Sequence, residues 1–128
     1  MIGTDIIEIE RVRVAASKPS FFDGVYTSAE KLYYISKDSR AEVLAGMFCA
    51  KEAVVKALGC GFRGFRPNAV EITHDELGAP GVRLLGKAAE QFPDAQIEVS
   101  ISHCKEYATA TALWKNKYAP KADENTKK

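Results

Sequence analysis

The period of the hydrophobic positions changes along the chain, and the first part is mainly helical. Residues Ile2 to Ile9 place isoleucine on both alternation sets, which is typical of a strand covered on both faces. A short helix is predicted from Glu10 to Ser17, because a proline follows closely. The capping-box sequence Thr27-Ser28-Ala29-Glu30 predicts the start of a second helix, which runs toward Ile35.

The longest helix is predicted from Arg40 to Leu58. A second capping-box sequence, Ser39 to Glu42, lies at its start, and Gly59 follows its last residue. Apolar residues cover nearly the whole circumference of this helix at about 100° per residue. We therefore expect a helix that is buried or lies at an interface.

After a glycine-rich segment the pattern becomes that of strands. Residues Val70 to Ile72 and Val82 to Leu85 are predicted strands, joined by a turn-rich segment from Asp75 to Gly81. Apolar and polar residues then alternate from Ile97 to Ser102 and again from Tyr107 to Leu113, which indicates a hairpin. Early helices and late antiparallel strands predict an α+β fold, a single domain in which the long buried helix packs on an antiparallel sheet.

Composition agrees with one soluble domain. The chain has 128 residues, of which 46% are hydrophobic and 27% charged. Its formal charge of +1 excludes a strongly basic nucleic-acid binder. Residues 1–118 are the predicted domain. The lysine-rich tail, residues 119–128, lacks an apolar period and is predicted to be disordered.

The cysteines and the N-terminal residues bear on location. Cys49, Cys60 and Cys104 form no Cys-x-x-Cys pair and are odd in number, which favours reduced thiols over a disulfide scaffold. No apolar run is long enough for a membrane-spanning helix, and the first residues do not resemble a signal peptide. These features predict a cytoplasmic protein that has no membrane partner.

Candidate chemistry lies where charge interrupts the apolar pattern, first at Asp5. Asp5 shares a strand face with Ile7 and Ile9 in a segment that is otherwise predicted to be buried. A buried carboxylate is costly unless it is paired, neutral or bound to a metal. A hydrogen-bonded structural aspartate and a metal ligand both remain open.

The long helix carries the second group of charges, Lys51, Glu52 and Lys56. Glu52 and Lys56 are four residues apart and share a face, so an ordinary surface ion pair is one interpretation. The apolar surroundings favour another. Two lysines and one glutamate leave an excess positive charge, which a bound anion would satisfy.

The third group is Ser100-Ile101-Ser102-His103, at the end of a predicted strand. A serine–histidine nucleophile pair, donors for a phosphate and purely structural roles are all compatible with these residues. His74 looks like part of an ordinary turn. Asp5 and Glu52 offer the hard oxygen ligands that Mg²⁺ takes alongside water and substrate phosphates. Together the three groups predict a metal–phosphate site, at which phosphoryl transfer is the usual chemistry.

Three segments also carry a family resemblance: Gly3 to Arg11, Phe48 to Gly59, and Ser100 to His103. They resemble the signatures of holo-[acyl-carrier-protein] synthases, small members of the 4′-phosphopantetheinyl transferase superfamily, and occur in the family's order. Weaker similarity fills the gaps, so that the resemblance covers about residues 1–113. It implies the 4′-phosphopantetheinyl transferase fold and transfer of 4′-phosphopantetheine from coenzyme A to a serine of apo acyl carrier protein, releasing adenosine 3′,5′-bisphosphate.

The resemblance also implies roles for individual residues. Asp5 and Glu52 would hold Mg²⁺, the expected cofactor, against the coenzyme A pyrophosphate. Glu52 and Lys56 are the expected catalytic residues, and the serine would be deprotonated by Glu52 or by a water on the metal. The expected coenzyme A contacts come from five residues: Lys51, Lys56, Pro80, Ser102 and His103.

Partners follow from the same resemblance. Arg11 would meet the acidic recognition helix of the carrier protein, and the reaction would support fatty acid biosynthesis. Family members form homotrimers with sites between subunits, which offers an explanation for a long helix that is apolar all round.

Two positions depart from the family pattern. Met47 stands where an arginine that reaches coenzyme A is common, which would cost about 1–2 kcal/mol of binding if a charge-assisted hydrogen bond is lost. Ala69 replaces a frequent acidic residue. The Met47 departure leaves open a non-catalytic module that binds coenzyme A or the carrier. A metal-dependent phosphohydrolase that uses water as acceptor is a third alternative.

Overall fold

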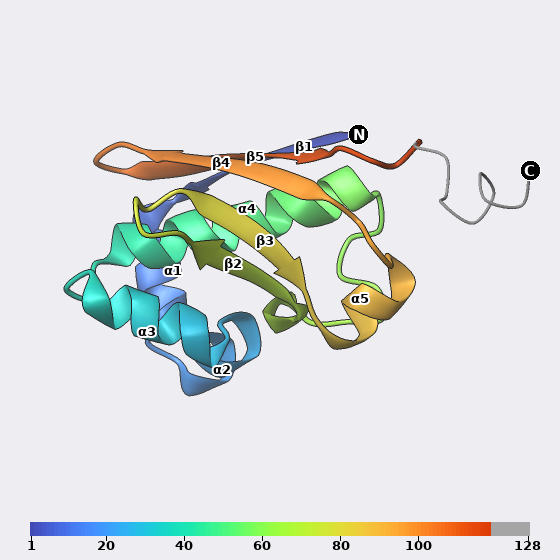
Figure 1. Cartoon of the computed structure of the whole chain (residues 1–128). Helices are drawn as coiled ribbons and strands as arrows, with labels where there is room; N and C mark the ends of the chain where they lie inside the picture. Colours follow the sequence, from blue (N-terminus) through green and yellow to red (C-terminus); the bar gives the residue numbers. More distant parts are fainter. Residues whose placement is uncertain (119–128) are drawn as a thin grey trace, which may run out of the picture.

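The computed structural model describes residues 1–118, so the predicted tail 119–128 lies outside the described residues. Strands and helices follow each other as an α+β chain (Figure 1). The strands are β1 (Ile2–Glu8), β2 (Val70–His74), β3 (Pro80–Leu84), β4 (Ile97–His103) and β5 (Tyr107–Trp114). The helices are α1 (Ile9–Ala16), α2 (Pro19–Val25), α3 (Ser28–Ser36), α4 (Ala41–Leu58), α5 (Gly86–Gln91) and a 3₁₀ turn, Pro67–Ala69.

The strands form two antiparallel sheets. One sheet has the strand order β1-β5-β4, and the other is the β2-β3 hairpin, whose strand β3 lies beside β4. Helix α4 runs beneath the three-stranded sheet, and α1, α2 and α3 lie on the far side of α4 from it (Figure 1). Two elements that were predicted, the long helix and the late hairpin, thus form the centre of the fold.

Helix α4 is buried on almost every side within one chain. It packs against β1, β5 and β4 on its sheet side and against β2 and α1 elsewhere. Its buried residues are Leu44, Ala45, Gly46, Met47, Cys49, Ala50, Lys51, Ala53, Val54, Val55, Ala57 and Leu58. The expectation that a neighbouring subunit explains the all-round apolar pattern of this helix is therefore wrong, because its own chain covers it.

Two glycines fix how α4 meets its surroundings. At Gly3 of β1, a Cβ atom would lie 2.0 Å from the Ala53 carbonyl oxygen, so only glycine lets the strand cross the helix this closely. At the other position, Gly59, φ is +76° and the residue ends α4 in the left-handed conformation. Close approach of β1 brings its inward residues against the α4 backbone.

Several local predictions need correction. Ile2 is 67% exposed and Ile6 is 63% exposed, so β1 is covered on one face only. The Thr27 capping box is present as predicted, but the Ser39 one is absent, because Ser39 has φ of +51° and Arg40 is the N-cap. The apolar periodicity did not predict the short helices α2 and α5, because neither completes two turns. None of the helices in residues 1–118 has the length and apolar character that crossing a bilayer requires.

Candidate active site

Asp5 lies on the inward face of β1, where α4 passes beneath it. One of its oxygens, Oδ1, accepts a hydrogen bond from Lys56 Nζ at 3.1 Å, and the same ammonium donates to the Thr4 carbonyl at 2.9 Å. The other oxygen, Oδ2, accepts from the buried Cys49 thiol at 3.4 Å. The Asp5 side chain remains 17% exposed and that of Lys56 53% exposed, so this pair is reachable from solvent.

Glu52 lies close enough to Asp5 and Lys56 to interact with both charges. Burial raises the pKa of the half-buried Glu52 carboxyl, the Asp5 charge raises it further, and the Lys56 ammonium lowers it. Two neighbouring carboxyl groups beside one ammonium form a set that a divalent cation would stabilise. Residues 1–118 hold no group of three or more histidine, cysteine, aspartate or glutamate side chains placed for a metal. Two carboxylates are nevertheless enough for Mg²⁺ when water and substrate phosphates complete the shell.

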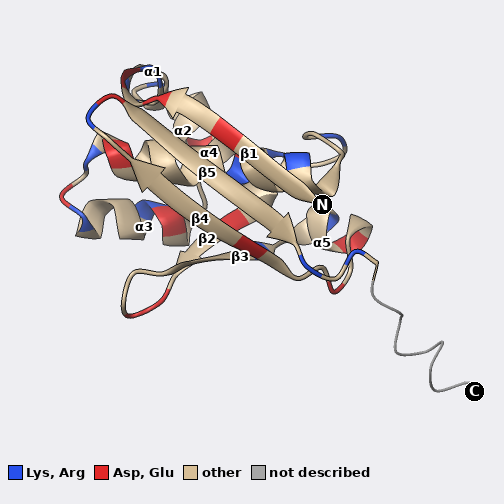
Figure 2. Cartoon of the chain, turned by 90° about the horizontal axis from the view of Figure 1, so that it is seen from above, with Lys and Arg blue, Asp and Glu red and all other residues tan. Residues whose placement is uncertain are grey.

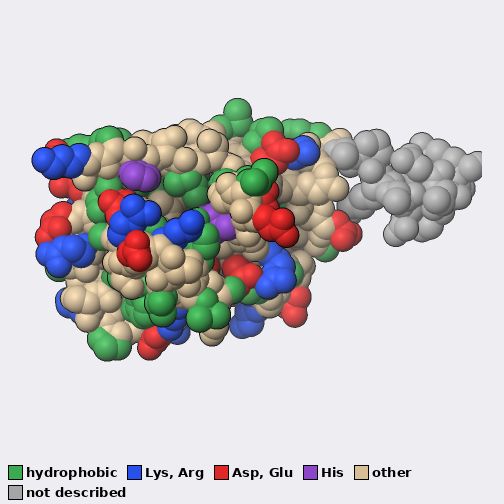
Figure 3. Space-filling view, turned by 60° about the vertical axis from the view of Figure 1, so that its left-hand side comes forward, with side chains coloured by type: hydrophobic (Ala, Val, Ile, Leu, Met, Phe, Trp, Pro, Cys, Tyr) green, Lys and Arg blue, Asp and Glu red, His purple; other side chains and the backbone are tan. Residues whose placement is uncertain are grey.

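A groove of about 310 Å³ lies on another side of the molecule, over the N-terminal half of α4 (Figure 3). Its apolar part contains Met47, Pro80 and Ile101, and both histidines, His74 and His103, also line it. The remaining lining residues are Tyr33, Lys37, Arg40, Glu42, Val43, Gly46 and Gly78. Apolar walls with a few basic and aromatic groups are typical of a site for a phosphorylated organic ligand.

The cluster of Asp5, Glu52 and Lys56 and the groove lie on opposite edges of the three-stranded sheet. Asp5 on β1 pairs with Ala110, which pairs in turn with Ile101 at the groove. In α4, Val43 lines the groove, and Glu52 follows nine residues later, which at about 100° per residue is on the opposite side of the helix. Within one chain, α4 therefore separates the carboxylates from the groove.

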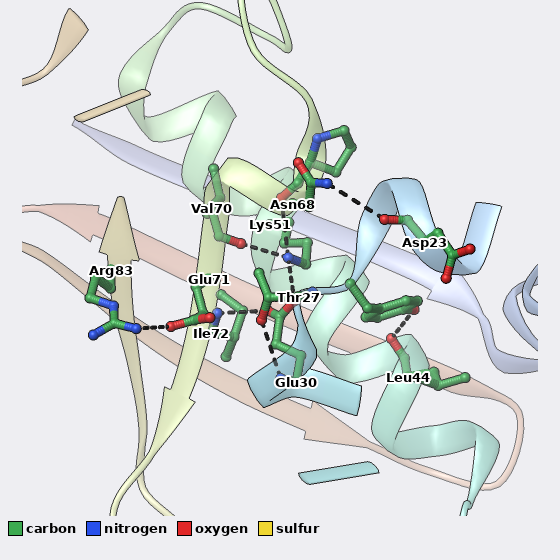
Figure 4. A network of polar contacts seen from close by, with 12 residues as sticks. Asp23, Thr27, Glu30, Leu44, Lys51, Asn68, Val70, Glu71, Ile72 and Arg83 are labelled. Atoms are coloured by element: carbon green, nitrogen blue, oxygen red, sulfur yellow. Dashed lines mark hydrogen bonds and ion pairs between the residues drawn. The ribbon is translucent and has the colours of Figure 1, made fainter. Parts of the chain in front are cut away.

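Lys51 is the clearest correction to the predicted site. Its side chain is 0% exposed, and its ammonium donates to Glu30 at 2.8 Å and to the carbonyls of Val70 at 2.6 Å and Pro67 at 3.1 Å (Figure 4). The structure leaves no donor surface of Lys51 for a phosphate. The expectation that Lys51 binds coenzyme A is therefore wrong, because the side chain points into the protein rather than toward the neighbouring Glu52 and Lys56.

The other predicted residues divide between the two edges and the sheet surface. Pro80 and His103 line the groove, whereas Asp5, Glu52 and Lys56 lie together at the β1 edge. Ser102 is exposed at the end of β4, opposite Thr109, and does not line the groove of its own chain. Arg11 is exposed on α1, next to an Arg13 that is paired with Glu10.

Sequence reasoning missed the aromatic and basic part of the groove. Tyr33 and His74 stack face to face, with ring centroids 3.6 Å apart and ring planes 3° apart. Lys37 lies over the Tyr33 ring at 5.6 Å, and Arg40 lines the same groove. The sequence pattern predicts only an ordinary turn at His74. No local signal joins a residue of α3 to the end of β2, so only the packing of these elements shows the pair.

The family model of the 4′-phosphopantetheinyl transferase superfamily matches residues 1–112. The chain therefore belongs to this superfamily, and it is an enzyme, a phosphopantetheinyl transferase, as its signatures predicted. A similar protein is the holo-[acyl-carrier-protein] synthase of Clostridium novyi, 47% identical over 116 residues, which cover 88% of this chain and 84% of that protein.

Solved structures agree with the fold. The Helicobacter pylori holo-[acyl-carrier-protein] synthase in complex with coenzyme A matches with a TM-score of 0.80 and 26% identity, over 90% of this chain and 100% of that one. The Bacillus anthracis holo-(acyl-carrier-protein) synthase in complex with coenzyme A (3′,5′-ADP) matches with a TM-score of 0.71 and 30% identity, over 87% and 91%. The α+β transferase fold expected from the sequence is thus confirmed.

Proposed function

We propose that this enzyme transfers the 4′-phosphopantetheine group from coenzyme A to a serine hydroxyl of apo acyl carrier protein, in a reaction that requires Mg²⁺. The observation that carries the proposal is the cluster of Asp5, Glu52 and Lys56 in a chain whose relatives are named for this reaction. Supply of holo carrier protein for fatty acid synthesis, in the cytoplasm, is the corresponding cellular role.

At the β1 edge, called here the carboxylate edge, Asp5, Glu52 and Lys56 would have different roles in the reaction. Asp5 and Glu52 would hold Mg²⁺, which neutralises the charge that develops on a diphosphate during phosphoryl transfer. Lys56, whose ammonium is half exposed beside Asp5, is placed to donate to the same phosphates. Glu52, with a raised pKa near these charges, is a candidate to accept the serine proton as the hydroxyl attacks.

The groove would hold the nucleotide end of coenzyme A. Pro80 and Ile101 offer an apolar surface for the adenine ring, and His103 offers a donor for phosphate. Lys37 and Arg40, also on the groove, can replace the charge that is missing at Met47. The complexes of similar proteins with coenzyme A and with coenzyme A (3′,5′-ADP) support this assignment.

A homotrimer with shared sites would bring the two edges together. The outer face of the three-stranded sheet is not covered by a described element and carries few charges (Figure 2). Exposed apolar residues on it include Ile2, Ile6, Tyr107 and Leu113. Burial of this face between copies would place the carboxylates of one subunit next to the groove of another, so that neither edge would work alone.

Arg11 would contact the carrier protein. It is exposed on α1, the helix that directly follows the strand carrying Asp5, whereas the nearby Arg13 is already paired with Glu10. An exposed guanidinium close to the reacting carboxylates suits an acidic partner that must present its serine there.

The test is a mass measurement on apo acyl carrier protein incubated with enzyme, coenzyme A and Mg²⁺. The carrier should gain the mass of one phosphopantetheine, and chelation of the metal should stop the gain until Mg²⁺ is restored. Asp5→Asn and Glu52→Gln should abolish transfer. Glu90→Gln, at an exposed carboxylate on α5, is the matched control and should leave the rate unchanged. No gain of mass by any carrier would refute the proposal.

The same assay separates the two alternatives. Tight binding of coenzyme A, measured by calorimetry, without transfer would indicate a binding module. That alternative rests on Met47, which is 1% exposed and stands where an arginine is common in the family. Release of phosphopantetheine in the absence of carrier would indicate a phosphohydrolase.

Shared sites have their own test. Asp5→Asn and His103→Ala, each defective alone, should regain activity when mixed and allowed to exchange subunits, because some sites then combine an intact carboxylate edge with an intact groove. Random mixing predicts about a quarter of the wild-type sites. Failure of exchanged mixtures to regain activity would show that each chain works by itself.

A further inference from the structure

The buried pair of Lys51 and Glu30 lies outside the chemistry described above. Both side chains are 0% exposed, and their charged atoms are 2.8 Å apart. Both oxygens of the Glu30 carboxylate accept hydrogen bonds. Oε1 accepts from Lys51 and from the Thr27 backbone at 2.8 Å, and Oε2 accepts from the Ile72 backbone at 2.7 Å (Figure 4).

These bonds join three elements at one point. Glu30 lies in the first turn of α3, Lys51 in the middle of α4, and the backbone partners Val70 and Ile72 in β2. Among the helices and strands, α3 makes its main contact with β2. The Glu30–Ile72 bond is therefore a direct polar connection along the contact that holds α3.

The same contact ends at the groove. Tyr33 follows Glu30 by three residues and lies on the same helical face, about 4.5 Å further along α3. His74 follows Ile72 by two residues and lies on the same strand face, about 6.6 Å further along β2. The stacked rings of Tyr33 and His74, with centroids 3.6 Å apart, are thus the next contact along the line that begins at Glu30.

We propose that the Lys51–Glu30 pair is a positioning device for the groove, holding α3 and β2 in the register at which Tyr33 stacks on His74. The assignment rests on the proposed function only in that the groove is taken to bind coenzyme A. A buried ion pair adds little net stability over apolar residues of similar volume, but it penalises any arrangement that leaves its charges unpaired. A shift of α3 by a fraction of a turn would break the bonds of Glu30 to both Ile72 and Lys51.

The test is Lys51→Met, which keeps the volume of the side chain and removes its charge and donors. We expect the affinity for coenzyme A to fall about tenfold, which corresponds to the loss of about one charge-assisted hydrogen bond between the displaced groove residues and the ligand. The maximal rate at saturating coenzyme A should stay within about twofold, since Glu52 and Lys56 lie on the opposite edge. Nuclear Overhauser contacts between the Tyr33 and His74 rings should weaken in the same variant.

Val54→Ala is the matched control, because Val54 is 0% exposed in the same helix and has no part in the Lys51–Glu30 bonds. At a temperature where both variants are folded, Val54→Ala should keep the ring contacts and the affinity. Equal losses in both variants would overturn the proposal, as would a folded Lys51→Met that keeps both readouts. Should Lys51→Met fail to fold, Glu30→Gln, which keeps the shape and removes the charge, decides by the same readouts.

The ring contacts need no coenzyme A. The chain has two histidines, so the His74 signals are assigned by comparison with His74→Gln. If the wild-type enzyme does not bind coenzyme A, the proposed function fails, while the Tyr33–His74 contacts still decide whether Lys51 and Glu30 position the groove.

Discussion

Replacement of Gly3 by alanine tests whether the close crossing of β1 over α4 sets the relative positions of Asp5 and Lys56. The new Cβ would lie 2.0 Å from the Ala53 carbonyl oxygen and 2.6 Å from the Ala57 nitrogen. Non-bonded atoms rest about 3.5 Å apart, so relief requires β1 and α4 to separate by about 1–1.5 Å. Both clashing atoms belong to the backbone of a buried helix, and neither can rotate away.

The expected cost is large. Overpacking of a core costs about 1–3 kcal/mol, and a clash with backbone belongs at or above the upper end of that range. A domain of this size is stable by about 5–15 kcal/mol, so Gly3→Ala should fold but with a clearly lower urea midpoint. Separation of the strand from the helix would also lengthen the 3.1 Å contact between Asp5 and Lys56, so the rate of transfer should fall as well.

Gly46→Ala is the control for the same substitution against the same sheet. Its Cβ would lie 3.0 Å from the Ile101 Cγ2 methyl, which can move, and alanine favours the helix by about 1 kcal/mol. We expect stability near that of the wild type. If Gly3→Ala were within about 1 kcal/mol of the wild type and fully active, the close crossing of β1 over α4 would not be a constraint.

Three further predictions concern the groove, its titration and the open sheet face. Met47→Arg should tighten coenzyme A binding about tenfold in calorimetry, because the arginine can form a charge-assisted hydrogen bond to phosphate. Met47→Leu is the control and should leave the affinity unchanged. Equal affinities of the two variants would show that the groove does not need this charge. Burial, and then the nearby Lys37, lower the pKa of His74 below 6.5. Between that lowered pKa and 6.5 the unfolded chain binds more protons than the folded protein, so stability should fall as pH drops through 6.5. Urea unfolding of His74→Phe, which keeps a ring and cannot titrate, should show a flatter pH dependence, and identical slopes would contradict the assignment. Ile6→Glu, at a residue 63% exposed in the single chain, should convert the proposed trimer into folded monomers, as measured by light scattering, and should abolish transfer. An unchanged mass would show that the sheet face is not the interface.

Sequence patterns located α4 well because its signals are local. Apolar residues at helical spacing, and a glycine that ends the helix, act on neighbouring residues and need no knowledge of the fold. The Ser39 capping box failed because the same letters also suit a turn, and the tertiary path turns the chain there in the left-handed region. The late hairpin was recoverable because its alternation and its tight loop are contiguous.

The candidate site was predictable only in part. Asp5 and Glu52 were singled out because carboxylates within apolar patterns are costly, and the structure brings them near one another. Lys51 is also a charged residue in an apolar pattern, but the prediction that it binds coenzyme A was wrong. A buried charge needs a partner, and the pattern does not say whether that partner is a ligand or another side chain, here Glu30. The Tyr33–His74 stack gave no signal, since its two residues come from elements far apart in sequence.

The amino-acid sequence by itself determined the α+β class, the central helix, the hairpin and the charged residues that must find partners, because periodicity and the cost of burying charge are properties of short segments. Only the tertiary structure decided which partner each charge meets. It separated Lys51 from Glu52, adjacent along the chain, since neighbours on a helix point about 100° apart and the surroundings on those two sides differ. It also divided the carboxylates from the groove, because α4 fills the space between the two edges of the sheet.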